Sequence, residues 1–170
     1  TVMKLWVRAS RDASCNPVAL TDRVPTMALV LGAAGAVPFL ALAFATPFVD
    51  VSLREQTTSV LTAYGAVILS FLGGIHWGLT INAIPAAAEE SRLFRRLSYS
   101  VVPALISWIA FLIPPAASLS VLAVAFVAVL CLDLIAARNE EVPEWYPRLR
   151  VPLTVAVVLS LITGVLADAV

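Results

Sequence analysis

Five long apolar stretches, separated by shorter polar segments, dominate the pattern of this chain. A helix of about 20 apolar residues is long enough to cross a lipid bilayer. The pattern therefore predicts an all-α fold, a polytopic membrane bundle of five transmembrane helices. The predicted helices cover roughly residues 26–48, 58–82, 97–114, 119–137 and 151–167. We predict a basic N-terminal tail over residues 1–25 and a five-helix transmembrane domain over residues 26–170.

The composition agrees with a membrane protein. Hydrophobic residues make up 61% of the chain and charged residues 13%, whereas soluble domains are about 45–50% apolar and about 25% charged. The formal net charge is zero and no basic stripe is present, so nothing indicates a nucleic-acid partner. Cys15 and Cys131 follow neither a disulfide framework nor a zinc-binding spacing. We therefore expect free thiols and no metal site.

The basic residues predict the orientation in the membrane. Along five spans, one side of the bilayer receives the tail and the second and fourth connections, which together hold ten of the 11 Lys and Arg residues; the other side receives only Arg54. Short cytoplasmic loops carry an excess of Lys and Arg, so the N-terminus is predicted to face the cytoplasm or the mitochondrial matrix. Cleavage of a transit peptide would leave a start such as Thr1, and so would a sequence that lacks its first residues. We expect a mitochondrial or bacterial inner membrane.

The second apolar stretch holds a stripe of small residues and the one histidine of the chain, His76. The stripe recurs every four positions, a spacing that keeps side chains on nearly the same helix face; it consists of Ala66, Ser70, Gly74 and Gly78. Small residues at this spacing let transmembrane helices approach closely. We predict that this face packs against another helix.

His76 and Asp133 are predicted to lie in the same leaflet, the inner one. His76 comes about six residues before the end of the second helix, and Asp133 about four before the end of the fourth, which places them roughly 9 Å and 6 Å deep. Arg148 and Arg150 are the favoured partners of the carboxylate, since arginine pairs with it in a bidentate way. Two readings stay open: a structural clamp, or a pocket that handles protons or binds a ligand.

Aromatic residues accompany this cluster. Trp77 follows His76, while Trp145 and Tyr146 lie in a proline-punctuated loop over residues 138–150, where they suit the aromatic belt of a membrane interface. Trp108 is predicted to lie in the middle of a span, where its indole N–H needs a partner. His76 is also a candidate for binding a cofactor, because one histidine can supply one axial haem ligand. No second histidine is present, so haem or quinone is the weaker reading and no cofactor is predicted.

The motifs YGAVILSFLGGIHWG, SVVPALISW and PEWYPRLRVPLT, with an Asp near the end of the fourth span, make the chain similar to the transmembrane protein 69 family. This is a family of unknown function found in proteobacteria and in eukaryotes with mitochondria. The resemblance covers about residues 26–168. It implies a small five-span membrane protein and no established activity. The matching residues are Gly74, His76, Trp77, Gly78, Asp133, Pro143, Trp145, Tyr146, Arg148 and Arg150.

No nucleophile motif, phosphate-binding loop or dinucleotide fingerprint is present, so we predict no catalytic residues. The first functional hypothesis is a non-catalytic accessory or assembly subunit of a larger inner-membrane complex, plausibly of the respiratory chain. Its partners would be other membrane subunits and lipid. The alternatives are a small-molecule binder or transporter that uses an inner-leaflet His76/Asp133 pocket, or a protein that binds haem or quinone.

Overall fold

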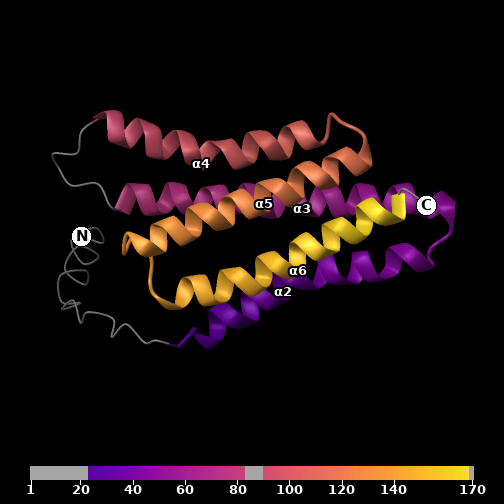
Figure 1. Ribbon diagram of the computed structural model, residues 1–170, viewed down its shortest axis with the longest axis horizontal. Helices are drawn as coiled ribbons and strands as arrows, with labels where there is room; N and C mark the ends of the chain where they lie inside the picture. The colour runs from indigo at the N-terminus through magenta and orange to yellow at the C-terminus, as the bar shows by residue number, and fades with distance from the viewer. Residues whose placement is uncertain (1–22, 83–89, 169–170) are drawn as a thin grey trace, which may run out of the picture.

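The computed structural model describes residues 23–82 and 90–168, and this part of the chain is helical with no strand (Figure 1). Successive long helices run in opposite directions along the bundle, so the described chain begins at one end and finishes at the other. The predicted all-α membrane bundle is confirmed. Its elements are α2 (Thr26–Ala45), the 3-10 helix η1 (Thr46–Phe48), α3 (Val51–Asn82), α4 (Glu90–Ala110), α5 (Pro115–Arg138) and α6 (Trp145–Asp168).

Four of these helices, α2, α3, α5 and α6, are long and apolar enough to cross a membrane. Their outer faces carry large apolar side chains such as Leu31, Phe44 and Val124, which are 73%, 75% and 71% exposed. In a soluble bundle such side chains would be packed inside, whereas in lipid they lie in a matching solvent. The backbone polar groups are paired within the helices, as the bilayer core requires.

The fifth helix, α4, has a charged first half that includes Arg92, Arg95 and Arg96. It lies along α3 and extends over a similar length of the bundle (Figure 1). The sequence prediction started this helix at residue 97, but the structure starts it at Glu90. Glu and Arg are good helix formers, so the helix continues beyond its apolar part.

Two more helices begin earlier than the apolar pattern indicated. α3 begins at Val51 rather than near residue 58, and α6 begins at Trp145 rather than near residue 151. The predicted proline-punctuated loop over residues 138–150 is therefore wrong in its second half, which forms the first turns of α6. Pro147 is accommodated there because the first backbone N–H groups of a helix have no partner within it.

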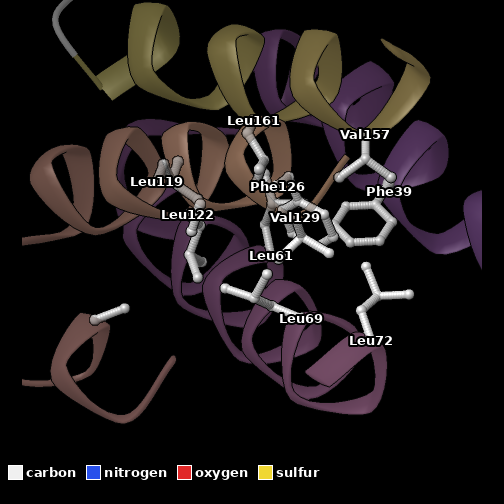
Figure 2. Packing of buried hydrophobic residues seen from close by; sticks show 12 residues of the cluster. Phe39, Leu61, Leu69, Leu72, Leu119, Leu122, Phe126, Val129, Val157 and Leu161 are labelled. Atoms are coloured by element: carbon white, nitrogen blue, oxygen red, sulfur yellow. The ribbon is translucent and has the colours of Figure 1, made fainter. Parts of the chain in front are cut away.

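The apolar core lies in the middle of the bundle, where α2, α3, α5 and α6 meet (Figure 2). Phe39 of α2 is fully buried and packs edge-on against Phe126 of α5, with ring centroids 6.0 Å apart. Its ring also lies 4.9 Å from that of Tyr64, whose hydroxyl donates a hydrogen bond to the Gly35 carbonyl oxygen at 2.9 Å. This bond ties α2 to α3 next to the core.

The predicted small-residue stripe only partly faces another helix. Ala66 is buried and Ser70 half-buried, but Gly74 and Gly78 are exposed, and a Cβ atom added at either would meet nothing within 4 Å. Positions four apart drift by about 40° per step on an α-helix, so three steps turn the stripe by about 120°. The prediction that Gly74 and Gly78 pack against a helix is wrong for this reason.

The closest helix approach uses Gly73 instead. A Cβ atom at Gly73 would come 2.5 Å from the Ser100 carbonyl oxygen of α4. No side chain can occupy that space unless one of the helices moves, so Gly73 is the glycine that sets the distance between α3 and α4.

The end of the bundle where α2, α4 and α6 begin and α3 and α5 finish is called here the basic end; it lies to the left in Figure 1. The basic residues of the described chain gather there, apart from Arg54. At the opposite end, Arg54 Nη1 donates to the Ala167 carbonyl oxygen of α6 at 3.3 Å. Lys4, Arg8 and Arg11 of the predicted tail lie outside the described residues.

Candidate polar site at the basic end

Asp133 is the centre of a buried polar cluster formed by three helices. It lies five residues before the end of α5, about 7.5 Å along the helix from Arg138, and is only 1% exposed. Its Oδ2 atom accepts a hydrogen bond from Arg150 Nε at 2.7 Å. Its Oδ1 atom lies 3.0 Å from His76 Nε2 and accepts a longer bond of 3.3 Å from the Tyr146 hydroxyl. The predicted pairing of Asp133 with an arginine is confirmed for Arg150.

Helix register explains why Arg150 reaches the carboxylate. Tyr146, Arg150 and Thr154 are spaced by four residues on α6 and so share one face. That face points into the bundle, because Arg150 is 8% exposed and Thr154 2%. Arg148 is two positions from Arg150, about 200° around the helix, and is exposed. The sequence prediction treated Arg148 and Arg150 alike because it placed both in a loop.

His76 approaches Asp133 from α3, and its side chain is 18% exposed. The His76 Nε2–Asp133 Oδ1 contact is short, but it does not meet the angular geometry of a well-formed hydrogen bond. Its main contribution is therefore electrostatic. An ionised carboxylate beside Nε2 favours the tautomer with the proton on Nε2, which leaves Nδ1 as a hydrogen-bond acceptor.

A cavity of about 230 Å³ opens beside His76 and is called here the His76 cavity. It lies between α3, α4, α5 and the connection after α5. Arg96 of α4 and Glu141 of that connection form an ion pair at this cavity. Its polar lining consists of His76, Thr80, Arg96, Tyr99, Asn139 and Glu141. Thr80 already donates to the His76 carbonyl oxygen at 2.9 Å. The half-buried imidazole ring of His76 is therefore one of the polar groups that a bound molecule would meet.

The predicted aromatic residues occupy different places. Trp77 is 41% exposed on the outer side of α3, since consecutive helical residues point about 100° apart. Trp145 is half-buried at the start of α6, with its ring centroid 6.1 Å from that of Tyr146. Trp108 was expected in the middle of a span, but it lies two residues before the end of α4 and is 62% exposed. It therefore suits the interfacial aromatic belt.

Within residues 23–82 and 90–168, no three His, Cys, Asp or Glu side chains come together in a way that could hold a metal ion. The Nε2 atom of His76 is directed at Asp133, so a haem iron would have to approach Nδ1.

Thr154 was missed by the sequence analysis, although its spacing of four from Arg150 signals the same helix face. Cys131 is exposed with a free thiol.

Comparison with known proteins gives the family. The family described as "Protein of unknown function (DUF3429)" matches residues 24–166. Transmembrane protein 69 of Xenopus tropicalis is 34% identical over 152 residues, which cover 89% of this chain and 58% of that protein. Transmembrane protein 69 of Mus musculus is 29% identical, with coverages of 85% and 57%. The chain thus spans somewhat over half the length of these relatives. No solved structure gives a significant match. The chain belongs to the DUF3429 family and is a transmembrane protein 69-like integral membrane protein.

Proposed function

We propose that this integral membrane protein binds a small polar molecule in the His76 cavity, next to the buried Asp133 carboxylate. The observation that carries the proposal is that His76, which lines that cavity, directly contacts the buried Asp133 carboxylate behind it. Ionisable side chains inside a membrane are costly and commonly mark a pathway or a binding site. A purely structural clamp would need only Asp133 and Arg150, whereas here the histidine adds a group that can accept a proton.

The charges around the His76 cavity favour a neutral or zwitterionic ligand. Arg96 and Glu141 contribute one charge of each sign, and Asp133 is balanced by Arg150. Neutral His76 would offer its Nδ1 atom as an acceptor, while Asn139 offers a side-chain amide. The volume of about 230 Å³ suits a molecule of amino-acid size, since a cavity of about 150 Å³ holds benzene.

The single histidine of the chain provides a direct test. This 170-residue chain, labelled with ¹⁵N-histidine, is prepared in nanodiscs, and the imidazole signals are recorded with alanine, succinate or putrescine. We expect the Nε2–H tautomer in the free protein, and a saturable shift of the ring signals with alanine but not with the two charged compounds. Ring signals that respond to none of the three would leave the cluster with a structural role and refute the proposal.

Two variants serve as a matched pair in the same titration. Asn139→Ala removes a polar group of the cavity at an exposed position, and the expected result is binding weakened by about 2–10-fold, as for the loss of one hydrogen bond. Ser120→Ala removes an exposed hydroxyl from the other end of α5, where Ser120 bonds only to its own helix at the Ala116 carbonyl oxygen. It should leave binding unchanged. Equal effects of the two substitutions would contradict binding in the His76 cavity.

A second proposed function is that of a non-catalytic accessory or assembly subunit in a larger inner-membrane complex, such as a respiratory one. It is supported by the described connections at 46–50, 111–114 and 139–144, which are short and offer little surface of their own for a separate activity. Mild detergent extraction with crosslinking tests it. Recovery of a stoichiometric membrane partner would support the subunit role, whereas a lone monomer would count against it.

We further propose that the membrane is the mitochondrial or bacterial inner membrane, with the basic end facing the matrix or cytoplasm. The uneven distribution of Lys and Arg between the two ends of the bundle supports this orientation. Lipid surrounds the exposed apolar faces in either case.

A further inference from the structure

A second cavity lies on the other side of the polar cluster, between α2, α3, α5 and α6. Its volume is about 170 Å³, and we call it the Arg150 cavity. It shares no lining residue with the His76 cavity. Its lining is apolar except for Arg150 and Thr154, which lie one helical turn apart on α6. Binding in the Arg150 cavity can therefore be tested separately from binding in the His76 cavity.

Both polar side chains in this cavity have buried atoms without a partner. Arg150 uses Nε to bind Asp133, but its Nη2 atom is buried and has no hydrogen-bond partner in the described chain. Thr154 is 2% exposed, and its Oγ1 atom is likewise buried without a partner there. Buried hydrogen-bonding groups in proteins are nearly always satisfied. An acceptor atom placed in the cavity could satisfy both donors.

The route into the Arg150 cavity is through lipid. Leu31 of α2 and Phe71 of α3 line it and are also 73% and 65% exposed on the outer surface of the bundle. Gly35 forms part of the wall, and a Cβ atom there would meet nothing within 4 Å. Arg150 lies five residues into α6, about 7.5 Å along the helix from its start. An occupant must therefore be soluble in the membrane.

Charge and size narrow the chemistry of the occupant. Asp133 already neutralises Arg150, so a second anion beside them would leave an unbalanced negative charge in an apolar environment, which is unfavourable. A neutral acceptor, such as a carbonyl oxygen, avoids this cost. The volume is close to that of a cavity of about 150 Å³ that holds a benzene ring. Phe39 and Phe126 of the apolar core form part of the wall of the Arg150 cavity.

We propose that the Arg150 cavity binds the head ring of a membrane-soluble, carbonyl-bearing ring compound of the quinone class. A ring carbonyl oxygen accepts hydrogen bonds from Arg150 Nη2 and Thr154 Oγ1, while the ring lies among the apolar side chains. The hydrocarbon tail leaves past Leu31 and Phe71 into the bilayer.

The test uses full-length protein in phosphatidylcholine nanodiscs and a photoactivatable azidoquinone with a ten-carbon tail. After illumination, the labelled peptides are identified by mass spectrometry. We expect labelling concentrated on the segments of α2 and α6 that line the cavity. Decylubiquinone should compete for this labelling, whereas decylbenzene, which lacks carbonyl oxygens, and decanoate, which is anionic, should compete at least tenfold less well.

Gly35→Leu and Gly74→Leu form the matched pair of variants. Both glycines have open space at the Cβ position, but only Gly35 lines the Arg150 cavity. Gly35→Leu should reduce competable labelling at least tenfold, and Gly74→Leu should not change it. Thr154→Val keeps the shape and removes the hydroxyl, so it should reduce labelling by about 3–10-fold, the effect of one hydrogen bond.

Several results would overturn the proposal. These are labelling spread evenly over the lipid-facing helices, equal competition by decylbenzene, or full labelling of Gly35→Leu. If Gly35→Leu does not fold, as judged by gel filtration and circular dichroism, Thr154→Val decides. Undiminished labelling of that variant would show that the Thr154 hydroxyl does not bind the ring carbonyl, and it would overturn the proposal.

Discussion

The buried pair of Asp133 and Arg150 offers the sharpest test of how the bundle is held together. At 1% and 8% exposure the two side chains are almost out of contact with solvent. Two unit charges about 4 Å apart attract by about 4 kcal/mol at an effective dielectric constant of 20. Much of this is offset by the cost of burying both charges, so the pair as a whole adds little to stability. Removing one partner alone is different, because it leaves a buried charge unbalanced.

The prediction is a double-mutant cycle on the free energy of unfolding in bicelles, measured by steric trapping. Asp133→Asn and Arg150→Gln should each destabilise the bundle, by about 3–5 kcal/mol where the remaining charge is left unpaired. The destabilisation by Asp133→Asn should fall at the lower end of this range, because the side-chain amide of the new asparagine can still contact His76 and Tyr146. The double variant should cost less than the sum of the single variants by about 0.5–3 kcal/mol.

The ion pair of Arg96 and Glu141 provides the control cycle. These side chains are 45% and 29% exposed, and exposed pairs are worth about 0–1 kcal/mol. The cycle of Arg96→Gln and Glu141→Gln should therefore give a coupling clearly smaller than that of the buried pair. Strict additivity at Asp133 and Arg150, or equal coupling in the two cycles, would refute the idea that the buried pair clamps α5 to α6.

The remaining predictions concern packing, the outer hydrogen bond of the cluster and orientation. Gly73→Leu should lower the stability of the bundle in detergent melts by about 1–3 kcal/mol through overpacking, whereas Gly74→Leu should leave the stability almost unchanged. A larger loss of stability in Gly74→Leu than in Gly73→Leu would contradict the contact of Gly73 with α4. Tyr146→Phe should lower the stability by about 1 kcal/mol or less, because the hydrogen bond from the Tyr146 hydroxyl to Asp133 is long, at 3.3 Å. A larger loss of stability in the same melts would show that this hydrogen bond contributes more than its length indicates. With the native cysteines replaced, Asn139→Cys and Asp50→Cys should react with impermeant thiol reagents from opposite sides of the membrane, and labelling from one side would refute the alternating topology.

The apolar pattern was sufficient for the fold because a bilayer imposes few alternatives. Backbone groups in lipid must be paired within each segment, so long apolar runs become helices. The pattern could not set where those helices begin. The first turns of α3 and α4 hold polar and charged residues, and their helical state depends on propensity and neighbouring helices rather than on hydrophobicity.

The small-residue stripe shows a second limit of sequence reasoning. Spacing by four identifies a shared face over one or two turns, but over twelve residues the face rotates by about 120°. Ala66 and Gly78 consequently belong to different environments, buried and exposed respectively. Gly73, outside the stripe, has the closest contact with α4. Which glycine packs depends on the position of the neighbouring helix, and that position is not encoded in the spacing.

The prediction of the polar site depended on whether residues 145–150 form a loop or the start of a helix. As a loop, this segment gave no reason to choose between Arg148 and Arg150. As the start of α6, it places Tyr146, Arg150 and Thr154 on one face and turns Arg148 away. The same register places one arginine, Arg150, beside both the Asp133 carboxylate and the Arg150 cavity. Its Nε atom donates to Asp133, while its Nη2 atom is buried without a hydrogen-bond partner in the described chain, and the side chain lines the Arg150 cavity together with Thr154. Arg150→Lys would separate the contact with Asp133 from a contact in the Arg150 cavity. Lysine has a single charged nitrogen, which cannot lie against the carboxylate and an acceptor in the cavity at the same time.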